Sequence, residues 1–252
     1  MKDLPIAVFD SGVGGISVLR ELIKQMPGER YLYFGDSANA PYGGKTTQQV
    51  KELTFAAAKM LMARGIKALV VACNTATAAA IAPLREIYPD AIIIGIEPAL
   101  KLAAEAFPGG TIGVMATQVT LREEKFSQQA ERFADTTLIR IPAPGLVELI
   151  EQGKQDDAET QAFLENLLAP YVGKLDALVL GCTHYPFVSR QIAGILGPKT
   201  RLLDGGEGTA RQTRRCLVNA GLLREGEGCV HMENSSHDPD LMALSMQLLE
   251  ED

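Results

Sequence analysis

Short apolar runs alternate with amphipathic stretches along this chain of 252 residues. Residues 68–72 and 177–180 are apolar at every position, a pattern typical of parallel strands that are buried on both faces. In contrast, Ile16, Leu19 and Leu22 recur at helical spacing on one face. The repeated order of strand, turn and helix predicts an α/β fold of doubly wound parallel sheets.

The pattern also predicts the order of the elements, which are separated by turns rich in glycine, proline and small polar residues. The expected strands are residues 6–9, 30–34, 68–72, 92–96, 111–115, 138–141, 177–180, 201–203 and 229–232. The expected helices are residues 16–23, a stretch from Thr46 or Thr47 to Gly65, residues 74–88, 121–133, 156–171 and 209–219, and the residues after Pro239. Residues 116–120 are expected to form a turn.

The two halves of the chain repeat one arrangement. Cys73 follows a buried strand and precedes a polar helix start, and Cys182 has the same setting. Each half opens with a strand and a small polar turn, at Asp10 and at Thr117, and the spacing from turn to cysteine is nearly the same. Because ligands of open α/β sheets bind at the carboxyl ends of the strands, we predict two similar domains that bring both thiols to one cleft.

The composition is that of a folded globular protein, with 46% hydrophobic and 22% charged residues. Lys and Arg total 24 against 31 for Asp and Glu, a net charge of -7, so no basic excess indicates a nucleic-acid partner. Apolar runs such as residues 91–96 are too short to span a bilayer, and no signal-peptide pattern is evident. Four cysteines do not form a disulfide framework, which favours free thiols in the cytoplasm.

Cys73 and Cys182 are the leading candidates for chemistry. Each precedes a predicted helix N-terminus, where the dipole and free N–H groups favour a thiolate. A free cysteine is more often a small buried apolar residue, but two in equivalent positions favour a function. Cys216 and Cys229 lack such neighbours, and we expect structural roles for them. No metal site is expected, because Cys-x-x-Cys spacing is absent and His184 is the one histidine nearby.

Residues 10–15 read Asp-Ser-Gly-Val-Gly-Gly, a turn between strand and helix that can present N–H groups to an anion. It is similar to the opening of a dinucleotide-binding unit, with Asp36 where a ribose-binding acid would lie. Ser17 occupies the position of the third glycine, however, and Asp10 would repel a pyrophosphate. These two residues weaken the match, and a nucleotide-binding module is the alternative function that this turn leaves open. The turn at residues 41–44 could also bind an anion.

Two thiols on opposite sides of a small anionic ligand suit a reaction that removes a proton from one face and returns it to the other. Inversion of a carbon next to a carboxylate is the natural example. His184, two residues after Cys182, could act as a general acid or base, whereas Glu151 is most simply a solvated charge at a helix end. No lysine in a Schiff-base setting is evident, so we expect no pyridoxal phosphate and no other cofactor. These turns contain no arginine, so N–H and hydroxyl groups would hold a carboxylate.

Four segments resemble those of the glutamate racemases, within the aspartate/glutamate racemase family, and they occur in the family's order. They are residues 9–15, residues 35–43 with Gly-Asp-Ser and Pro-Tyr-Gly, residues 71–77 with Cys-Asn-Thr, and residues 180–186 with Gly-Cys-Thr-His-Tyr-Pro. The resemblance runs from Ile6 to about Gly208, and the two cysteine segments together are highly specific to the family.

The resemblance implies an isomerase that interconverts L- and D-glutamate with two bases and no cofactor, and that supplies D-glutamate for bacterial peptidoglycan. Cys73 and Cys182 would be the acid–base residues, Cys182 acting on L-glutamate and Cys73 on D-glutamate. Asp10 and His184 would assist them, and Glu151 would support His184. The implied substrate contacts are Asp10, Ser11, Pro41, Tyr42, Gly43, Asn74, Thr75, Thr117, Thr120, Thr183 and His184.

The resemblance also implies that residues 208–252 return to a first domain of residues 1–96, leaving residues 97–207 as the second domain. We further expect a homodimer. At residues 36–39 this chain reads Asp-Ser-Ala-Asn, whereas many relatives carry Asp-Thr-Ala-Arg. The alternatives within the superfamily are an aspartate racemase or a related α-proton enzyme such as a hydantoin racemase, because cavity length is not readable from sequence.

Overall fold

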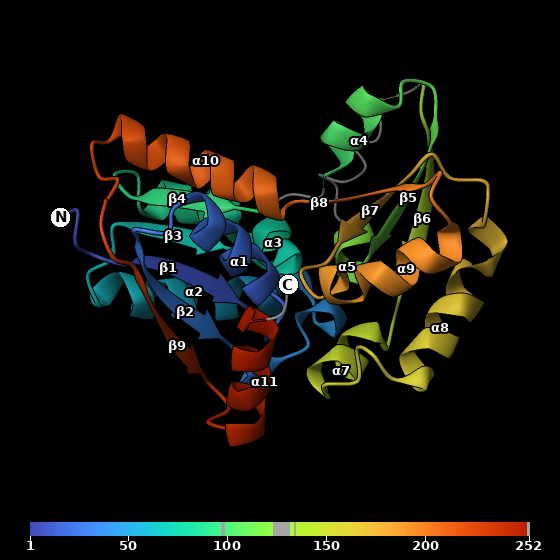
Figure 1. The fold of residues 1–252 in the computed structure, drawn as a ribbon. Coiled ribbons are helices and arrows are strands. Elements are labelled where there is room, and N and C mark those ends of the chain that lie inside the picture. The colour runs from blue at the N-terminus through green and yellow to red at the C-terminus, as the bar shows by residue number, and fades with distance from the viewer. Residues whose placement is uncertain (97–98, 123–131, 134, 251–252) are drawn as a thin grey trace.

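The structure, a computed structural model, describes residues 1–96, 99–122, 132–133 and 135–250. Within these ranges the chain forms two parallel sheets, each covered by helices on both faces (Figure 1). The predicted fold class is confirmed. None of the helices in these ranges is both long and apolar enough to cross a membrane.

The first sheet has five parallel strands in the order β4-β3-β1-β2-β9. They are β1 (Ile6–Asp10), β2 (Arg30–Gly35), β3 (Ala68–Val71), β4 (Ile92–Gly95) and β9 (Cys229–Asn234). Helices α1 (Ile16–Gln25), α10 (Gly206–Asn219) and α11 (Pro239–Glu250) pack on one face, and α2 (Thr47–Ala63) and α3 (Asn74–Ile87) on the other. The central strand β1 is buried at every position, which accounts for its continuous apolar run.

The second sheet has four parallel strands in the order β6-β5-β7-β8. They are β5 (Thr111–Ala116), β6 (Thr137–Pro142), β7 (Ala177–Gly181) and β8 (Arg201–Asp204). Helices α4 (Leu100–Ala106) and α5 (Gln118–Arg122) cover one face, and α7 (Leu146–Glu151), α8 (Ala158–Leu168) and α9 (Ser189–Leu196) the other. Short 3₁₀ turns are η1 (Ser37–Asn39), η2 (Tyr42–Gly44), η3 (Ala169–Tyr171) and η4 (Tyr185–Val188).

The end of the chain completes the first sheet. Strand β9 pairs in parallel with β2, so that Cys229 lies opposite Arg30 and Asn234 opposite Gly35. A buried ion pair between Lys67 and Glu29 lies at the amino ends of β3 and β2. Lys67 Nζ also donates to the carbonyl of Leu222, and Glu29 accepts from the backbone N–H of Arg224. These contacts fasten the returning segment to the first strands.

Several local expectations differ from the structure. Helices α4, α7 and α9 were not predicted, because spans of six to eight residues give too few turns for a clear periodic signal. Residues 116–120 were expected to form a turn, but α5 begins at Gln118. The helix expected over residues 121–133 falls mostly outside the described residues.

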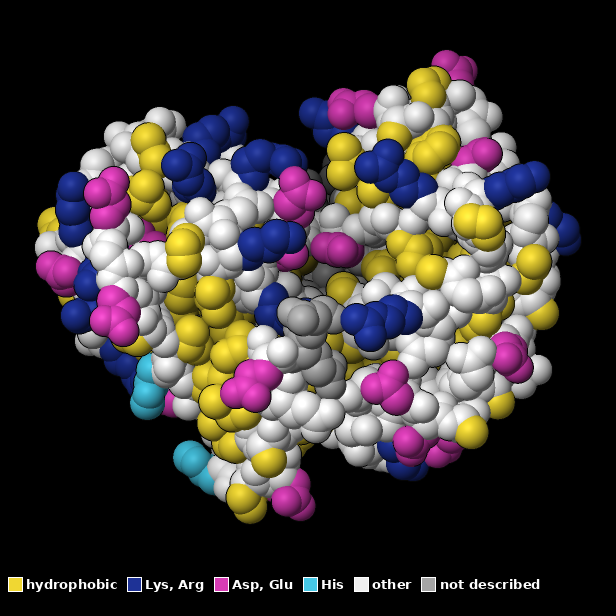
Figure 2. Space-filling view, in the orientation of Figure 1, with side chains coloured by type: hydrophobic (Ala, Val, Ile, Leu, Met, Phe, Trp, Pro, Cys, Tyr) yellow, Lys and Arg dark blue, Asp and Glu magenta, His cyan; other side chains and the backbone are white. Residues whose placement is uncertain are grey.

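Charged side chains of both signs are interspersed over the face drawn in Figure 2. On that face Lys and Arg do not gather into a stripe, in keeping with the net charge of -7.

Candidate active site

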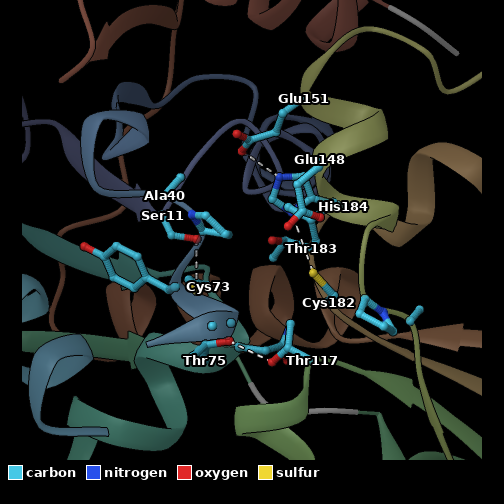
Figure 3. A pocket seen from close by; sticks show the side chains of 18 of the residues that line it. Ser11, Ala40, Cys73, Thr75, Thr117, Glu148, Glu151, Cys182, Thr183 and His184 are labelled. Carbon is cyan, nitrogen blue, oxygen red and sulfur yellow. Dashed lines mark hydrogen bonds and ion pairs between the residues drawn. The ribbon is translucent and has the colours of Figure 1, made fainter. Parts of the chain in front are cut away.

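Both candidate cysteines line one cavity of about 210 Å³ between the two sheets (Figure 3). Cys73 follows β3 and is the N-cap residue of α3, while Cys182 directly follows β7. Parallel strands place their carboxyl ends at one edge of each sheet, and here these two edges face each other. Both side chains are buried. The structure therefore brings the two thiols together from residues more than one hundred positions apart.

The surroundings of Cys73 favour its protonated thiol form. Its Sγ accepts a hydrogen bond from the N–H of Ala76 and lies 3.4 Å from Ser11 Oγ. Burial, and next the negative charge of Asp10, raise the pKa of Cys73 to about 12, against the smaller opposing effect of those two hydrogen bonds. At physiological pH Cys73 is therefore a neutral thiol.

Cys182 has a cation beside it. His184 Nδ1 lies 3.6 Å from Cys182 Sγ, and its Nε2 lies 2.9 Å from Glu151 Oε1. Burial alone would lower the pKa of His184, but its bonds to Cys182 and Glu151 outweigh burial and raise that pKa well above 6.5. The raised pKa favours the imidazolium form of His184, in which both ring nitrogens donate, one toward the sulfur and one toward the carboxylate. A thiolate formed at Cys182 would face this positive charge.

Asp10 lies behind the cavity wall, at the carboxyl end of β1. Its Oδ1 accepts from the N–H of Gly12 at 2.9 Å, and its Oδ2 accepts from Thr183 Oγ1 at 3.1 Å. Burial raises the pKa of this carboxyl group, although the nearby charge of His184 partly opposes the shift. Asp10 does not line the cavity itself and reaches it through Thr183, which does.

The glycine-rich loop approaches the second sheet too closely for side chains. A Cβ at Gly12 would overlap Glu151 Oε1, and one at Gly14 would overlap His184 Nδ1. The N–H of Val13 donates to the same Glu151 oxygen at 3.3 Å. A pyrophosphate at this loop would meet that carboxylate, so the glycines serve contact between the two sheets. The dinucleotide interpretation of this loop is not supported.

The remaining predicted residues form the other walls. Thr75 Oγ1, Thr117 Oγ1 and Thr120 Oγ1 form a chain of hydroxyls at 3.1 and 3.0 Å, which joins α3 to the second sheet. Thr75 and Thr117 line the cavity, whereas Thr120 lies behind Thr117. Ser11, Pro41, Tyr42, Gly43, Asn74 and Thr183 also line it. Among the described lining residues none is Lys or Arg.

The model of the Asp/Glu/Hydantoin racemase family matches residues 11–213, a range that holds both cysteines. The chain belongs to this racemase family. It is 49% identical over 252 residues to the glutamate racemase of Clostridium botulinum (strain Okra / Type B1), with 98% of each chain covered.

Solved structures of the racemase family have the same fold. Glutamate racemase isoform RacE1 from Bacillus anthracis superposes with a TM-score of 0.90 at 30% identity, covering 100% of this chain and 96% of that one. Glutamate racemase from Francisella tularensis, in complex with D-glutamate, superposes with a TM-score of 0.87 at 26% identity, covering 100% and 95%.

Part of this racemase-family cavity was not predicted from the sequence. Its unpredicted lining residues lie mainly before and within α7, together with neighbours of predicted positions; they are Ala40, Gln118, Ala143, Pro144, Gly145, Val147, Glu148 and Tyr185. The only signal for α7 is the helical spacing of Leu146, Leu149 and Ile150 after Gly145, and six residues are too few for that spacing to stand out. Within the described residues, no cluster of three or more His, Cys, Asp or Glu side chains could hold a metal ion.

Proposed function

We propose that this protein interconverts L- and D-glutamate by a two-thiol mechanism without a cofactor. The observation that carries the proposal is the unequal setting of Cys73 and Cys182 in one cavity, the first a neutral thiol and the second facing an imidazolium. A two-base racemase needs one protonated and one deprotonated group at the start of turnover. The glutamate racemases to which the chain is similar over its whole length support the same conclusion.

In the direction from L-glutamate, Cys182 thiolate removes the proton from Cα, so that a Cα–H bond breaks and an S–H bond forms. The electron pair left on Cα delocalises into the adjacent carboxylate. Cys73 then transfers its thiol proton to the opposite face, which gives D-glutamate and a Cys73 thiolate. The His184 imidazolium beside Cys182 and the high pKa of Cys73 favour this starting state.

Backbone N–H groups at two helix starts would hold the carboxylates of the substrate. The first amides of α3, at Asn74 and Thr75, and of η2, at Tyr42 and Gly43, belong to the N-terminal turns that lack partners within the helix. Asn74 Oδ1 is buried without a hydrogen-bond partner and would accept from the substrate ammonium. In this proposal Ser11, Pro41, Thr117 and Thr183 complete the walls, and Thr120 orients Thr117.

The cavity volume supports a small substrate. At about 210 Å³ the cavity is smaller than the ~300–1,000 Å³ typical of sites for drug-sized ligands. A dinucleotide would not fit within it. We infer that the product enters peptidoglycan synthesis in the cytoplasm and that the enzyme acts as a homodimer of two-domain subunits, with residues 1–96 and 208–252 as one domain and residues 97–207 as the other.

Deuterium exchange at Cα tests this function. L-Glutamate incubated in D₂O with the purified protein, without added cofactor, should gain deuterium at Cα and lose optical rotation. L-Aspartate in a parallel incubation separates the two dicarboxylates, because its side chain is one methylene group shorter than that of glutamate. Turnover of aspartate in preference to glutamate would establish the other racemase specificity. Exchange that begins only after pyridoxal phosphate is added would rule out the two-thiol mechanism.

A further inference from the structure

Asp36 is a buried carboxyl group close to the cavity that the proposed chemistry does not use. It directly follows β2, and its backbone N–H donates to the carbonyl of Asp10 at 2.9 Å. Its side chain is buried, with 6% of the residue exposed. A carboxyl group in such a place requires hydrogen-bond donors, and the structure supplies them from three separate segments.

The donors come from η1, from η2 and from the turn after β9. Asn39 Nδ2 lies 3.0 and 3.1 Å from the two carboxyl oxygens of Asp36. Tyr42 OH donates to Oδ2 at 2.7 Å, and Ser235 Oγ donates to Oδ1 at 2.7 Å. One amide and two hydroxyl groups therefore hold this carboxyl group.

Tyr42 transmits this arrangement to the cavity. Its hydroxyl is directed to Asp36 rather than to a ligand, and its ring lies 6.4 Å from the ring of Phe9 in the core. Residues 40–44, which include Tyr42, all line the cavity. On the far side of this wall, a Cβ at Gly43 would lie 2.9 Å from Thr117 Cγ2, so the wall packs directly against the second sheet.

The turn after β9 fixes the same wall from outside. Ser235 Oγ accepts from the N–H of Ala38 at 3.0 Å, and Asn234 Nδ2 donates to Ser37 Oγ at 2.8 Å. The backbone N–H of Ser235 donates to the carbonyl of Gly35 at 2.9 Å. Asn234 and Ser235 therefore contact residues 35–38, the segment that leads into the cavity wall.

We propose that Asp36 is a positioning residue which, through Tyr42 and together with Ser235, sets the place of wall residues 40–44 and thereby the affinity for substrate. This inference rests on the proposed function for its kinetic consequence. The wall carries no acid or base, so it contacts substrate and transition state alike. Loss of its position should raise KM and leave kcat nearly unchanged.

Kinetics of Asp36→Ala and Ser235→Ala test the inference. We expect Asp36→Ala to raise KM about tenfold for both glutamate enantiomers, with kcat changed less than about threefold, since hydrogen bonds to a charged group are lost. Ser235→Ala should raise KM in the same direction by a smaller factor. Ser236→Ala is the matched control, because Ser236 Oγ bonds Asn234 and not Asp36, and its KM should be that of the unsubstituted protein.

Two further variants separate positioning from general stability. Asp36→Asn can accept from Ser235 and Asn39 and donate to Tyr42 Oη, so it should restore KM to within about threefold. Tyr42→Phe should raise KM. Adding Asp36→Ala to it should change KM little further, because both substitutions remove the same hydrogen bond, from Tyr42 OH to Asp36. An unchanged KM in Asp36→Ala and Ser235→Ala, with a lowered melting temperature only, would overturn the inference.

Hydrogen exchange of the segment from Ser37 to Lys45 gives a readout that does not depend on turnover. We expect faster exchange in Asp36→Ala and Ser235→Ala and unchanged exchange in Ser236→Ala. If the unsubstituted protein failed to racemise glutamate, the proposed function would be lost while exchange still decided whether Asp36 holds the wall. Exchange rates equal in all variants would overturn the positioning role. If Asp36→Ala did not fold, Ser235→Ala and Tyr42→Phe would decide both measurements.

Discussion

Thr183 donates a hydrogen bond to Asp10 across the boundary between the two sheets, with Oγ1 and Oδ2 3.1 Å apart. Asp10 belongs to the sheet that carries Cys73, whereas Thr183 directly follows Cys182. The charge of Asp10 raises the pKa of Cys73, and the charge of His184 acts in turn on Asp10. Asp10 therefore acts on Cys73 through its charge and contacts Thr183, the neighbour of Cys182 in the sequence.

Substitution of either active cysteine should remove racemisation without unfolding the protein. Cys73→Ser and Cys182→Ala should each lower turnover by at least about 10²- to 10⁴-fold, the usual contribution of an acid–base group. Serine at position 73 can still cap α3, so the melting temperature of Cys73→Ser should not fall. Cys216→Ala, in the half-buried part of α10, is the control and should keep full turnover. Substantial racemisation by either active-site variant would reduce that cysteine to a packing residue.

Asp10→Asn should stabilise the protein at neutral pH and impair its activity. Burial raises the pKa of Asp10 above 3.8, so the folded state binds this proton more tightly than the unfolded chain does. The cost of the buried charge is absent below pH 3.8, grows as pH rises toward the folded pKa, and is constant above it. Asparagine carries no charge, can accept from the N–H of Gly12 through Oδ1, and can donate from Nδ2 to Thr183 Oγ1.

The melting temperature of Asp10→Asn should therefore exceed that of the unsubstituted protein at pH 7.5, and the difference should shrink as pH falls toward 3.8. Asp90→Asn, at an exposed position between α3 and β4, controls for the change of net charge. A lower melting temperature of Asp10→Asn at pH 7.5 would mean that the His184 charge outweighs burial.

Gly14→Ala should disable the site without replacing any catalytic side chain. The added methyl group would overlap His184 Nδ1 and lie 2.6 Å from Thr183 Oγ1, so the segment beside Cys182 must shift. A displacement of that kind can cost about 100-fold in turnover. Gly194→Ala is the matched control, because its methyl group would meet nothing within 4 Å and alanine favours helix α9 by about 0.5–1 kcal/mol. Equal turnover in both variants would contradict the close contact.

Lys67→Met should be among the most destabilising single changes. The Lys67 and Glu29 side chains are completely buried, and the substitution leaves Glu29 as an uncompensated charge, at a cost of about 3–5 kcal/mol. Urea unfolding should show this large loss in the free energy of unfolding for Lys67→Met. The double variant Lys67→Met with Glu29→Gln should recover part of that free energy. Lys101→Ala, from an exposed pair with Glu105, should change the free energy of unfolding by at most about 0.5 kcal/mol. A small effect at Lys67 would mean that water reaches the pair.

Strand positions and the two cysteines could be predicted because their signals are local. An apolar run of four or five residues that ends at a cysteine reads the same way in β3 and β7, with no knowledge of the rest of the chain. Glu151 could not be placed in this way. Its role depends on a 2.9 Å contact with His184, which lies 33 residues further along the chain, and on the helix α7 that the periodicity was too short to indicate.

The loop at Gly12 and Gly14 illustrates a second limit. Small residues in a row signal that something comes close to the backbone, but they do not say what does. A bound phosphate and a neighbouring sheet both require small residues at these positions. Only the fold shows that Glu151 and His184 are the groups that come close. The place of β9 beside β2 likewise depends on a pairing between the two ends of the chain.

The place of β9 also has a consequence for synthesis on the ribosome. All strands of the second sheet lie between residues 111 and 204, so that sheet is complete before the last part of the chain emerges. The first sheet begins earlier and finishes later, because β9 and α11 come from residues 229–250. Until then β2 is an open edge, and Asp36 lacks the hydroxyl of Ser235. A nascent chain that has released β8 but not β9 therefore holds a finished second sheet beside an unfinished first one, and the cavity wall becomes fixed only after residues 229–235 have emerged.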